Sequence, residues 1–375
     1  MHTGQTNTAI STMLAGRIEA GDFPSAVYVV AERDEVIFAD ALGDAVRESA
    51  RHAATIETIY DLASLTKPLV TGLLCALFIE RGLVAPDRAV SDYLPEFARE
   101  DKSPLTVRQL LTHTSGLPAW RPLYLLCGGR REKALSIIAA QPLDYAPGTR
   151  VVYSDFGFIT LGFLLQSLAG VALAELARLE IFEPLGLTHT FFNPEHARRT
   201  EIAACESAGN GYERGMCAEE YGEQHPGAWR EQTVWGEVHD GNAYFLGGAA
   251  GHAGLFSTAF ETLRLTRQFH AATTSLLKAE TCHLFRTNMT EGLDEARSLA
   301  WQLAATPAST AGPGLSPDSF GHLGFTGTSC WNDPRHERVF ILLTNRTHAR
   351  TLPFVNINSV RRSFHTLAVE ALEAR

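Results

Sequence analysis

Lysine is scarce in this chain of 375 residues. Lysine and arginine together number 32, but only four of these residues are lysines: Lys67, Lys102, Lys133 and Lys278. Arginine stays protonated in proteins and cannot act as a general base near neutral pH, whereas lysine can. A lysine inside a chemical motif therefore stands out in this sequence.

Basic clusters and long apolar runs are also lacking. The net charge is −10, and basic residues gather only in pairs such as Arg130-Arg131 and Arg361-Arg362, so nucleic acid is not an expected partner. No apolar run approaches the ~18 to 20 residues of a membrane span, so no span is expected. The first 25 residues lack the basic start and apolar block of a signal peptide. We expect a cytoplasmic protein, or a periplasmic one if a leader was removed.

The metal-binding patterns of small domains are absent as well. The six cysteines form no Cys-x-x-Cys pair and are expected to be reduced and mostly buried. His113, His239 and His252 are spaced so that no two form a ligand pair on one element. No metal is therefore expected.

The most informative motif is Ser64-Leu65-Thr66-Lys67. Residues three apart share one face of a helix, so both side chains point the same way. A serine hydroxyl becomes a good nucleophile when a base takes its proton, and a lysine whose pKa is depressed by burial can be that base. The apolar stretch Leu69–Ile79 follows, which places Ser64 at a helix start where unpaired N–H groups favour negative charge.

The same spacing occurs a second time, at Ser275-Leu276-Leu277-Lys278. No apolar strand or loop leads into Ser275, which opens an ordinary amphipathic segment, Ser275–Phe285. We interpret Ser275 as a helix N-cap and Ser64 as the functional serine.

Strand patterns occupy both ends of the chain and helical patterns its middle. The simplest arrangement is an α+β fold, in which N- and C-terminal strands form one antiparallel sheet flanked by helices, with an all-α part inserted. We predict a sheet domain of residues 1–63 and 295–375, and a helical domain of residues 64–294 with a long loop near 197–238. Ser64 would lie between the two. The expected strands are Ser25–Ala31, Glu35–Ala41, Leu299–Thr306, Phe320–Phe325, Thr328–Trp331 and Val339–Thr344.

Two further segments supply partners for such a serine. Tyr153 lies just before a predicted helix that begins at Asp155, where its phenol could share a proton with Lys67; a packed core tyrosine is the alternative. His322 and Gly324 lie on a predicted strand where a substrate backbone could approach closely. The N–H groups of Ser64 and Phe325 are candidate oxyanion donors, and His322 could deliver a proton or orient substrate.

In this order, the segments resemble a known family, the class C β-lactamase-related serine hydrolases, which include β-lactamases, penicillin-binding DD-peptidases and carboxylesterases. The resemblance covers roughly residues 10 to 370. The matching segments are Ser64–Lys67, Leu110–Leu117, Tyr153-Ser154-Asp155, Gly251–Thr258, His322-Leu323-Gly324 and Thr344-Asn345-Arg346.

The resemblance implies a β-lactamase/transpeptidase-like fold and no cofactor. It implies that Ser64 is the acylated nucleophile, Lys67 its base and Tyr153 a proton shuttle that activates water. His322 and Gly324 would line the pocket. Asp155 stands where many relatives have asparagine, and His322 replaces the lysine of true class C β-lactamases, which holds a substrate carboxylate. Both departures argue against an efficient β-lactamase.

These residues predict a serine hydrolase acting on small esters, amides or β-lactams, with esters favoured. A D-Ala-D-Ala carboxypeptidase or weak β-lactamase is the alternative. A third hypothesis is a non-catalytic sensor that keeps the fold without the chemistry. The oligomeric state and the physiological substrate are not indicated by the sequence.

Overall fold

The computed structural model describes residues 4–48, 51–222 and 229–375. Within these ranges, a seven-stranded antiparallel sheet has the strand order β3-β2-β1-β9-β8-β7-β6, and β4 pairs with β5 in a small second sheet. The strands are β1 (Ser25–Glu32), β2 (Glu35–Val46), β3 (His52–Ala53), β4 (Tyr60–Asp61), β5 (Phe256–Ser257), β6 (Gln302–Leu303), β7 (Phe320–Leu323), β8 (Ser329–Asp333) and β9 (Arg338–Thr344).

The two ends of the chain meet at the centre of the large sheet. Strand β1 pairs with β2 on one side and with β9 on the other, with Val29 opposite Ile341. The prediction of one antiparallel sheet built from N- and C-terminal strands is therefore confirmed.

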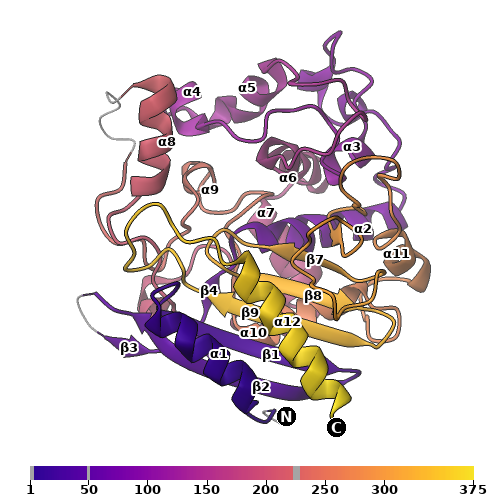
Figure 1. Ribbon diagram of the computed structural model, residues 1–375. Coiled ribbons are helices and arrows are strands. Elements are labelled where there is room, and N and C mark those ends of the chain that lie inside the picture. The colour runs from indigo at the N-terminus through magenta and orange to yellow at the C-terminus, as the bar shows by residue number, and fades with distance from the viewer. Residues whose placement is uncertain (1–3, 49–50, 223–228) are drawn as a thin grey trace.

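Alternating side chains of β1 enter two different cores. Tyr28 and Val30 pack with apolar residues of α1 and α12, whereas Val27 and Val29 belong to the core that extends into the helical part. Successive side chains of a strand point to opposite faces, so a strand buried on both faces is apolar throughout. Figure 1 shows α1 and α12 side by side over one face of the sheet, with the helical part above its edge.

The α-helices and helical turns occupy most of the middle of the chain. The α-helices are α1 (Thr8–Glu19), α2 (Leu73–Glu80), α3 (Val107–Leu111), α4 (Leu123–Leu126), α5 (Ala134–Ala140), α6 (Asp155–Ala169), α7 (Leu173–Ala177), α8 (Gly211–Tyr221), α9 (Gly241–Phe245), α10 (Ala259–Thr266), α11 (Ala279–Leu284) and α12 (Asn358–Glu373). The shorter turns include η1 (Ala63–Leu65) and the π-helical η2 (Lys67–Gly72), which lead into α2.

The segment that runs through η1, η2 and α2 is the apolar centre of the helical part. Ala63–Glu80 has a mean hydropathy of 1.4 over 18 residues, so the expectation that no apolar run reaches this length was wrong. However, 83% of the segment is buried inside the protein, as a core helix would be. A bent pair, Asp155–Ala169 with Leu173–Phe182, passes the same test of composition only when taken together across a 76° bend.

Two local predictions were wrong. The expected strand Leu299–Thr306 is reduced to β6, because the chain turns at Ala300, which has a positive φ of 66°. No helix begins at Ser275, because α11 starts at Ala279. Thr274 Oγ1, one residue earlier, accepts hydrogen bonds from the N–H groups of Leu276 and Leu277. Ser275 is therefore an exposed turn residue and not an N-cap.

The segment 197–238, expected as a long loop, contains an eleven-residue helix, α8. Residues 223–228 of that segment lie outside the described residues. The division into two domains at 63/64 and 294/295 remains a prediction. Helix α10, which falls within the predicted helical domain, packs on β1 and β9 of the sheet.

We predict that Gly251→Ala destabilises the fold. A Cβ at this position would lie 1.9 Å from Phe158 O and 3.0 Å from Gly162 N, both on α6. The turn that carries Gly251 and helix α6 would have to separate, at an expected cost of roughly 2–3 kcal/mol in the free energy of unfolding. Urea unfolding measures this cost.

The matched control is Gly215→Ala on α8, where a Cβ meets nothing within 4 Å. Alanine favours the helix over glycine by up to about 1 kcal/mol, so this variant should be neutral or more stable. Equal unfolding midpoints for Gly251→Ala and the wild type would contradict the close packing described.

Candidate active site

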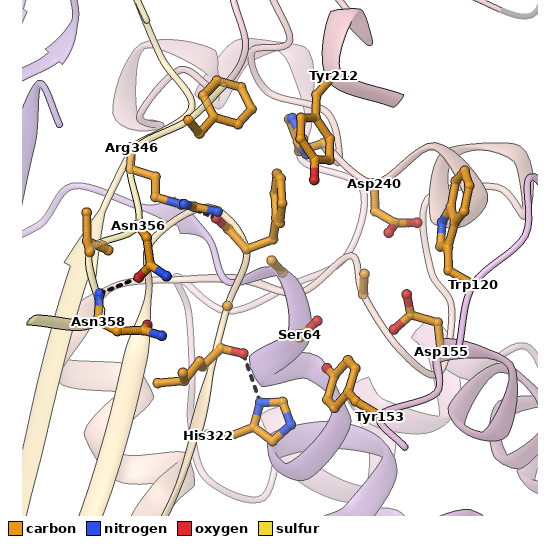
Figure 2. A pocket seen from close by; sticks show the side chains of 18 of the residues that line it. Ser64, Trp120, Tyr153, Asp155, Tyr212, Asp240, His322, Arg346, Asn356 and Asn358 are labelled. Carbon is orange, nitrogen blue, oxygen red and sulfur yellow. Dashed lines mark hydrogen bonds between the residues drawn. The ribbon is translucent and has the colours of Figure 1, made fainter. Parts of the chain in front are cut away.

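A cavity of about 700 Å³ opens where β7 faces the helical part. Six of the residues singled out from the sequence line it: Ser64, Tyr153, Asp155, His322, Gly324 and Phe325. Figure 2 shows Ser64 at the centre of this pocket, with Tyr153 and His322 on one side of it and Tyr212 on the other. The seventh, Lys67, is fully buried behind Ser64.

A strained turn presents Ser64 to the cavity. The residue before it, Ala63, has a φ of 47°, in the left-handed region that alanine rarely adopts. The Asp61 carboxylate holds this turn by accepting the Ala63 N–H at 2.8 Å, and Thr66 Oγ1 donates to Ala63 O at 2.7 Å. Such strain persists only when its surroundings over-determine it, and it is common at reactive residues.

Two backbone N–H groups near Ser64 are free of the regular hydrogen-bond ladders. The first bond of turn η1 runs from Leu65 N to Leu62 O, so the Ser64 N–H precedes it. On the strand side, Phe325 follows the end of β7 in a turn that the Gly327 N–H closes on Gly324 O, and the Phe325 N–H donates to no backbone oxygen among the described residues. These are the two donors expected for an oxyanion.

Gly324 allows the strand to come this close to the serine turn. A Cβ on residue 324 would lie 2.0 Å from Thr328 Oγ1 and 2.6 Å from Leu62 O. Because Leu62 belongs to the turn that carries Ser64, any side chain here would push the strand and the turn apart.

Lys67 reaches Ser64 from beneath. Its Nζ lies 3.0 Å from Ser64 Oγ, 3.1 Å from His252 O and 2.7 Å from Asp155 Oδ1. The side chain has no exposed surface. The ammonium therefore contacts the nucleophile, a backbone carbonyl and a carboxylate at once.

The charge on Lys67 differs from the sequence-based expectation. Burial lowers the pKa of Lys67, but Asp155 and Tyr153 raise it by more, so the pKa lies above its usual value. The assumption that burial depresses the pKa of this lysine is therefore wrong for the resting site. Lys67 rests as an ammonium paired with Asp155.

Tyr153 lies between several charged and aromatic groups. Lys67 Nζ is 4.7 Å from its ring centroid, and the rings of His113 and His322 are 4.5 Å and 5.7 Å away. Burial raises the pKa of Tyr153, and Lys67 opposes this shift only in part. Tyr153 is thus a protonated phenol at rest, and its buried hydroxyl has no hydrogen-bond partner among the described residues.

His322 carries no charge in this site. Burial, with Lys67 and Arg297 nearby, holds the pKa of His322 well below its usual value. Its Nδ1–H donates to Leu323 O at 2.9 Å, which leaves Nε2 as an acceptor without a partner among the described residues. A neutral ring cannot supply the fixed positive charge of the lysine that it replaces.

Asp155, Asp240 and His252 form a group that the sequence did not predict. Each of the three residues offers one atom that could bind a metal ion, and these atoms lie within 4.8 Å of one another. His252 Nε2 is 2.9 Å from Asp240 Oδ1. Burial raises the pKa of Asp240, but the contact with His252 lowers it by more, so this pKa lies below its usual value. The Lys67 ammonium already sits 2.7 Å from Asp155, so a cation is present in this group without a metal.

Other residues of the pocket wall also escaped the sequence analysis. They come from the loops and from α8, inside the segment that was expected to be a loop. No motif or spacing marks them, because they meet only in the folded chain. They include Trp120, Tyr212, Met216, Arg297, Arg346 and Phe354.

We predict that Asp155→Asn lowers the pKa of Lys67. The substitution removes the largest of the effects that raise this pKa, while the lowering effect of burial remains. Because the chain has only four lysines, the ammonium signal of Lys67 can be assigned by NMR with lysine labelled at the terminal carbon. The matched control is Asp101→Asn, which removes the acidic partner of Lys102 outside the pocket. A Lys67 titration that is unchanged in Asp155→Asn would contradict the ion pair.

Known proteins resemble this chain in sequence and in fold. The sequence matches the beta-lactamase family over residues 10–358. A curated Escherichia coli K12 protein, named putative D-alanyl-D-alanine carboxypeptidase, is 32% identical over 364 aligned residues, which cover 90% of this chain and 81% of that protein.

Two solved structures share the fold. EstCE1, described as a hydrolase with promiscuous acyltransferase activity, superposes with a TM-score of 0.72 at 23% identity and covers 95% of this chain and 97% of its own. A penicillin-binding protein homologue from Caulobacter crescentus has a TM-score of 0.73 at 20% identity and covers 98% and 99% of the two chains. The predicted β-lactamase/transpeptidase-like fold is confirmed, and the chain belongs to the beta-lactamase family of serine hydrolases.

Proposed function

We propose that this chain hydrolyses small carboxylic esters or amides through an acyl-enzyme on Ser64, with esters favoured. The observation that supports this proposal most strongly is the contact of Ser64 Oγ with Lys67 Nζ at 3.0 Å, beside Tyr153 and below two free N–H groups. Nucleophile, proton acceptor and oxyanion donors then surround one point in the cavity.

Acylation begins with the Lys67–Asp155 pair. Passing one proton across the 2.7 Å contact leaves a neutral amine on Lys67 and a carboxylic acid on Asp155. The amine takes the Ser64 hydroxyl proton while Ser64 Oγ bonds to the substrate carbonyl carbon. The oxygen of the tetrahedral intermediate accepts hydrogen bonds from the N–H groups of Ser64 and Phe325.

Collapse of that intermediate breaks the bond to the leaving group, which takes a proton from Tyr153. The resulting phenolate recovers its proton from water as the hydroxide attacks the acyl carbon. The bond from the acyl carbon to Ser64 Oγ then breaks, Lys67 returns a proton to Ser64 Oγ, and Asp155 returns its proton to Lys67, which restores the resting site. Lys67, 4.7 Å from the Tyr153 ring centroid, stabilises the phenolate in between.

The neutral His322 supports esters over substrates whose carboxylate needs a positive charge at this position. A D-Ala-D-Ala carboxypeptidase is the second candidate, and the name of the curated Escherichia coli relative favours it. The non-catalytic sensor stays a third hypothesis, distinguished by an acyl-enzyme that forms and is not hydrolysed. The cytoplasmic location expected from the sequence also remains a proposal.

We predict a burst of p-nitrophenol when p-nitrophenyl acetate is mixed with the protein, followed by slower steady turnover. Intact mass spectrometry should find one acetyl group, and peptide mapping should place it on Ser64. Ser64→Ala should lower kcat by at least about 1000-fold, because the nucleophile is lost.

The control is Ser275→Ala, which alters the exposed second copy of the spacing and should retain wild-type turnover. Full activity of Ser64→Ala, or acetylation on Ser275, would refute the assignment. Lys67→Arg keeps a charge but cannot release a proton near neutral pH, so it should be as inactive as Ser64→Ala.

A panel of three substrates separates the candidate activities. We expect kcat/KM for p-nitrophenyl acetate to exceed that for a D-Ala-D-Ala peptide and for a chromogenic cephalosporin by more than about tenfold, because His322 offers no charge to their carboxylates. Faster release of D-alanine than of p-nitrophenol would establish the carboxypeptidase instead.

A further inference from the structure

We propose that Arg297 provides the fixed positive charge that favours the anionic form of Tyr153 during the reaction. This inference rests on the proposed function, in which Tyr153 becomes a phenolate. Arg297 acts through Tyr153 and not on the substrate, so it is a positioning residue for the proton shuttle.

The placement of Arg297 is the first observation. The residue lies on the segment before β6 and is only 5% exposed. Its guanidinium carbon is 5.7 Å from the centroid of the Tyr153 ring, within the range of a cation–π contact. No sequence motif marks this position.

The hydrogen bonds of Arg297 are the second observation. Its Nε and Nη2 face Glu295, at 2.9 Å and 2.8 Å from Oε2. Its Nη1 is buried and has no partner among the described residues. A buried guanidinium N–H without an acceptor is costly. We take this cost as a sign that a neighbouring group requires the positive charge of Arg297.

None of the remaining groups around Tyr153 carries a positive charge through the whole cycle. Burial, with Arg297 and Lys67 as the next causes, holds the pKa of His113 well below its usual value. His322 is neutral for similar reasons. Asp155 is negative and opposes a phenolate. Lys67 is positive, but it is shared with Asp155 and Ser64 and gives up a proton in the proposed acylation step.

Arg297 is therefore the one cation in contact with the Tyr153 ring that keeps its charge throughout the cycle, as far as the described residues go. It also lines the same cavity as His322. The positive charge that the neutral His322 does not supply is thus present in the same cavity, on a different segment.

The test compares Arg297→Gln with Arg297→Lys on p-nitrophenyl acetate. Loss of the charge should lower kcat by about tenfold with KM nearly unchanged, and should move the rise of kcat with pH upward by about one pH unit, because a phenolate forms less readily. Arg297→Lys keeps a charge and should recover most of the rate.

The matched control is Arg338→Gln. Arg338 is also buried and pairs with Glu32 at 2.8 Å and Glu373 at 3.9 Å, but lies on β9 away from the pocket. It reports the cost of losing a buried ion pair and should leave the pH profile unchanged. A pH profile of Arg297→Gln that matches the control, or an Arg297→Lys variant as slow as Arg297→Gln, would overturn the proposal.

A double-mutant cycle tests whether Arg297 acts through Tyr153. In a Tyr153→Phe background no phenolate can form, so adding Arg297→Gln should cost no more than about a further twofold. A full tenfold loss in that background would show that Arg297 serves the substrate directly and overturn the proposal. If the proposed function is wrong, the wild type itself shows no turnover. If only the role of Arg297 is wrong, the wild type turns over and the variants fail to show the expected pattern.

Discussion

The site depends on one contact, the 2.7 Å ion pair between Lys67 and Asp155. A fully buried ammonium is expensive unless it is paired and hydrogen-bonded. Asp155 compensates the charge, while Ser64 Oγ and His252 O accept its remaining protons. This arrangement fixes Lys67 against the nucleophile. The same short contact lets a proton pass from Lys67 to Asp155, which leaves Lys67 as a neutral amine.

The fold exists to bring three distant segments to this contact. The pairing of β1 with β9 joins both ends of the chain, and β7 stands two places further along the same sheet. The serine turn approaches that strand closely only because residue 324 is glycine. Helix α6 begins at Asp155 and so carries the partner of Lys67 at its first residue. The serine turn, β7 and the start of α6 are elements of the packed fold, which suits a site that needs a fixed geometry.

Much of this could be predicted from the sequence, and the reasons are physical. Strand alternation and helix periodicity are local signals, so the sheet and α6 were predicted well. Ser64, Lys67, Tyr153 and His322 carry recognisable local patterns. The pKa of Lys67 was mistaken because it depends on a partner 88 positions away in the chain, whose charge competes with burial. Arg297, Asp240 and Tyr212 join the pocket only through tertiary packing, so no periodicity or spacing marks them.

The most direct measurement of the account is a crystal structure of the protein after reaction with a small alkyl fluorophosphonate, a mimic of the tetrahedral intermediate. The account predicts a phosphorus–oxygen bond to Ser64 Oγ, with the phosphoryl oxygen between the N–H groups of Ser64 and Phe325, and Tyr153 on the leaving-group side. Phosphonylation of another residue, or a phosphoryl oxygen pointing away from these two N–H groups, would contradict it.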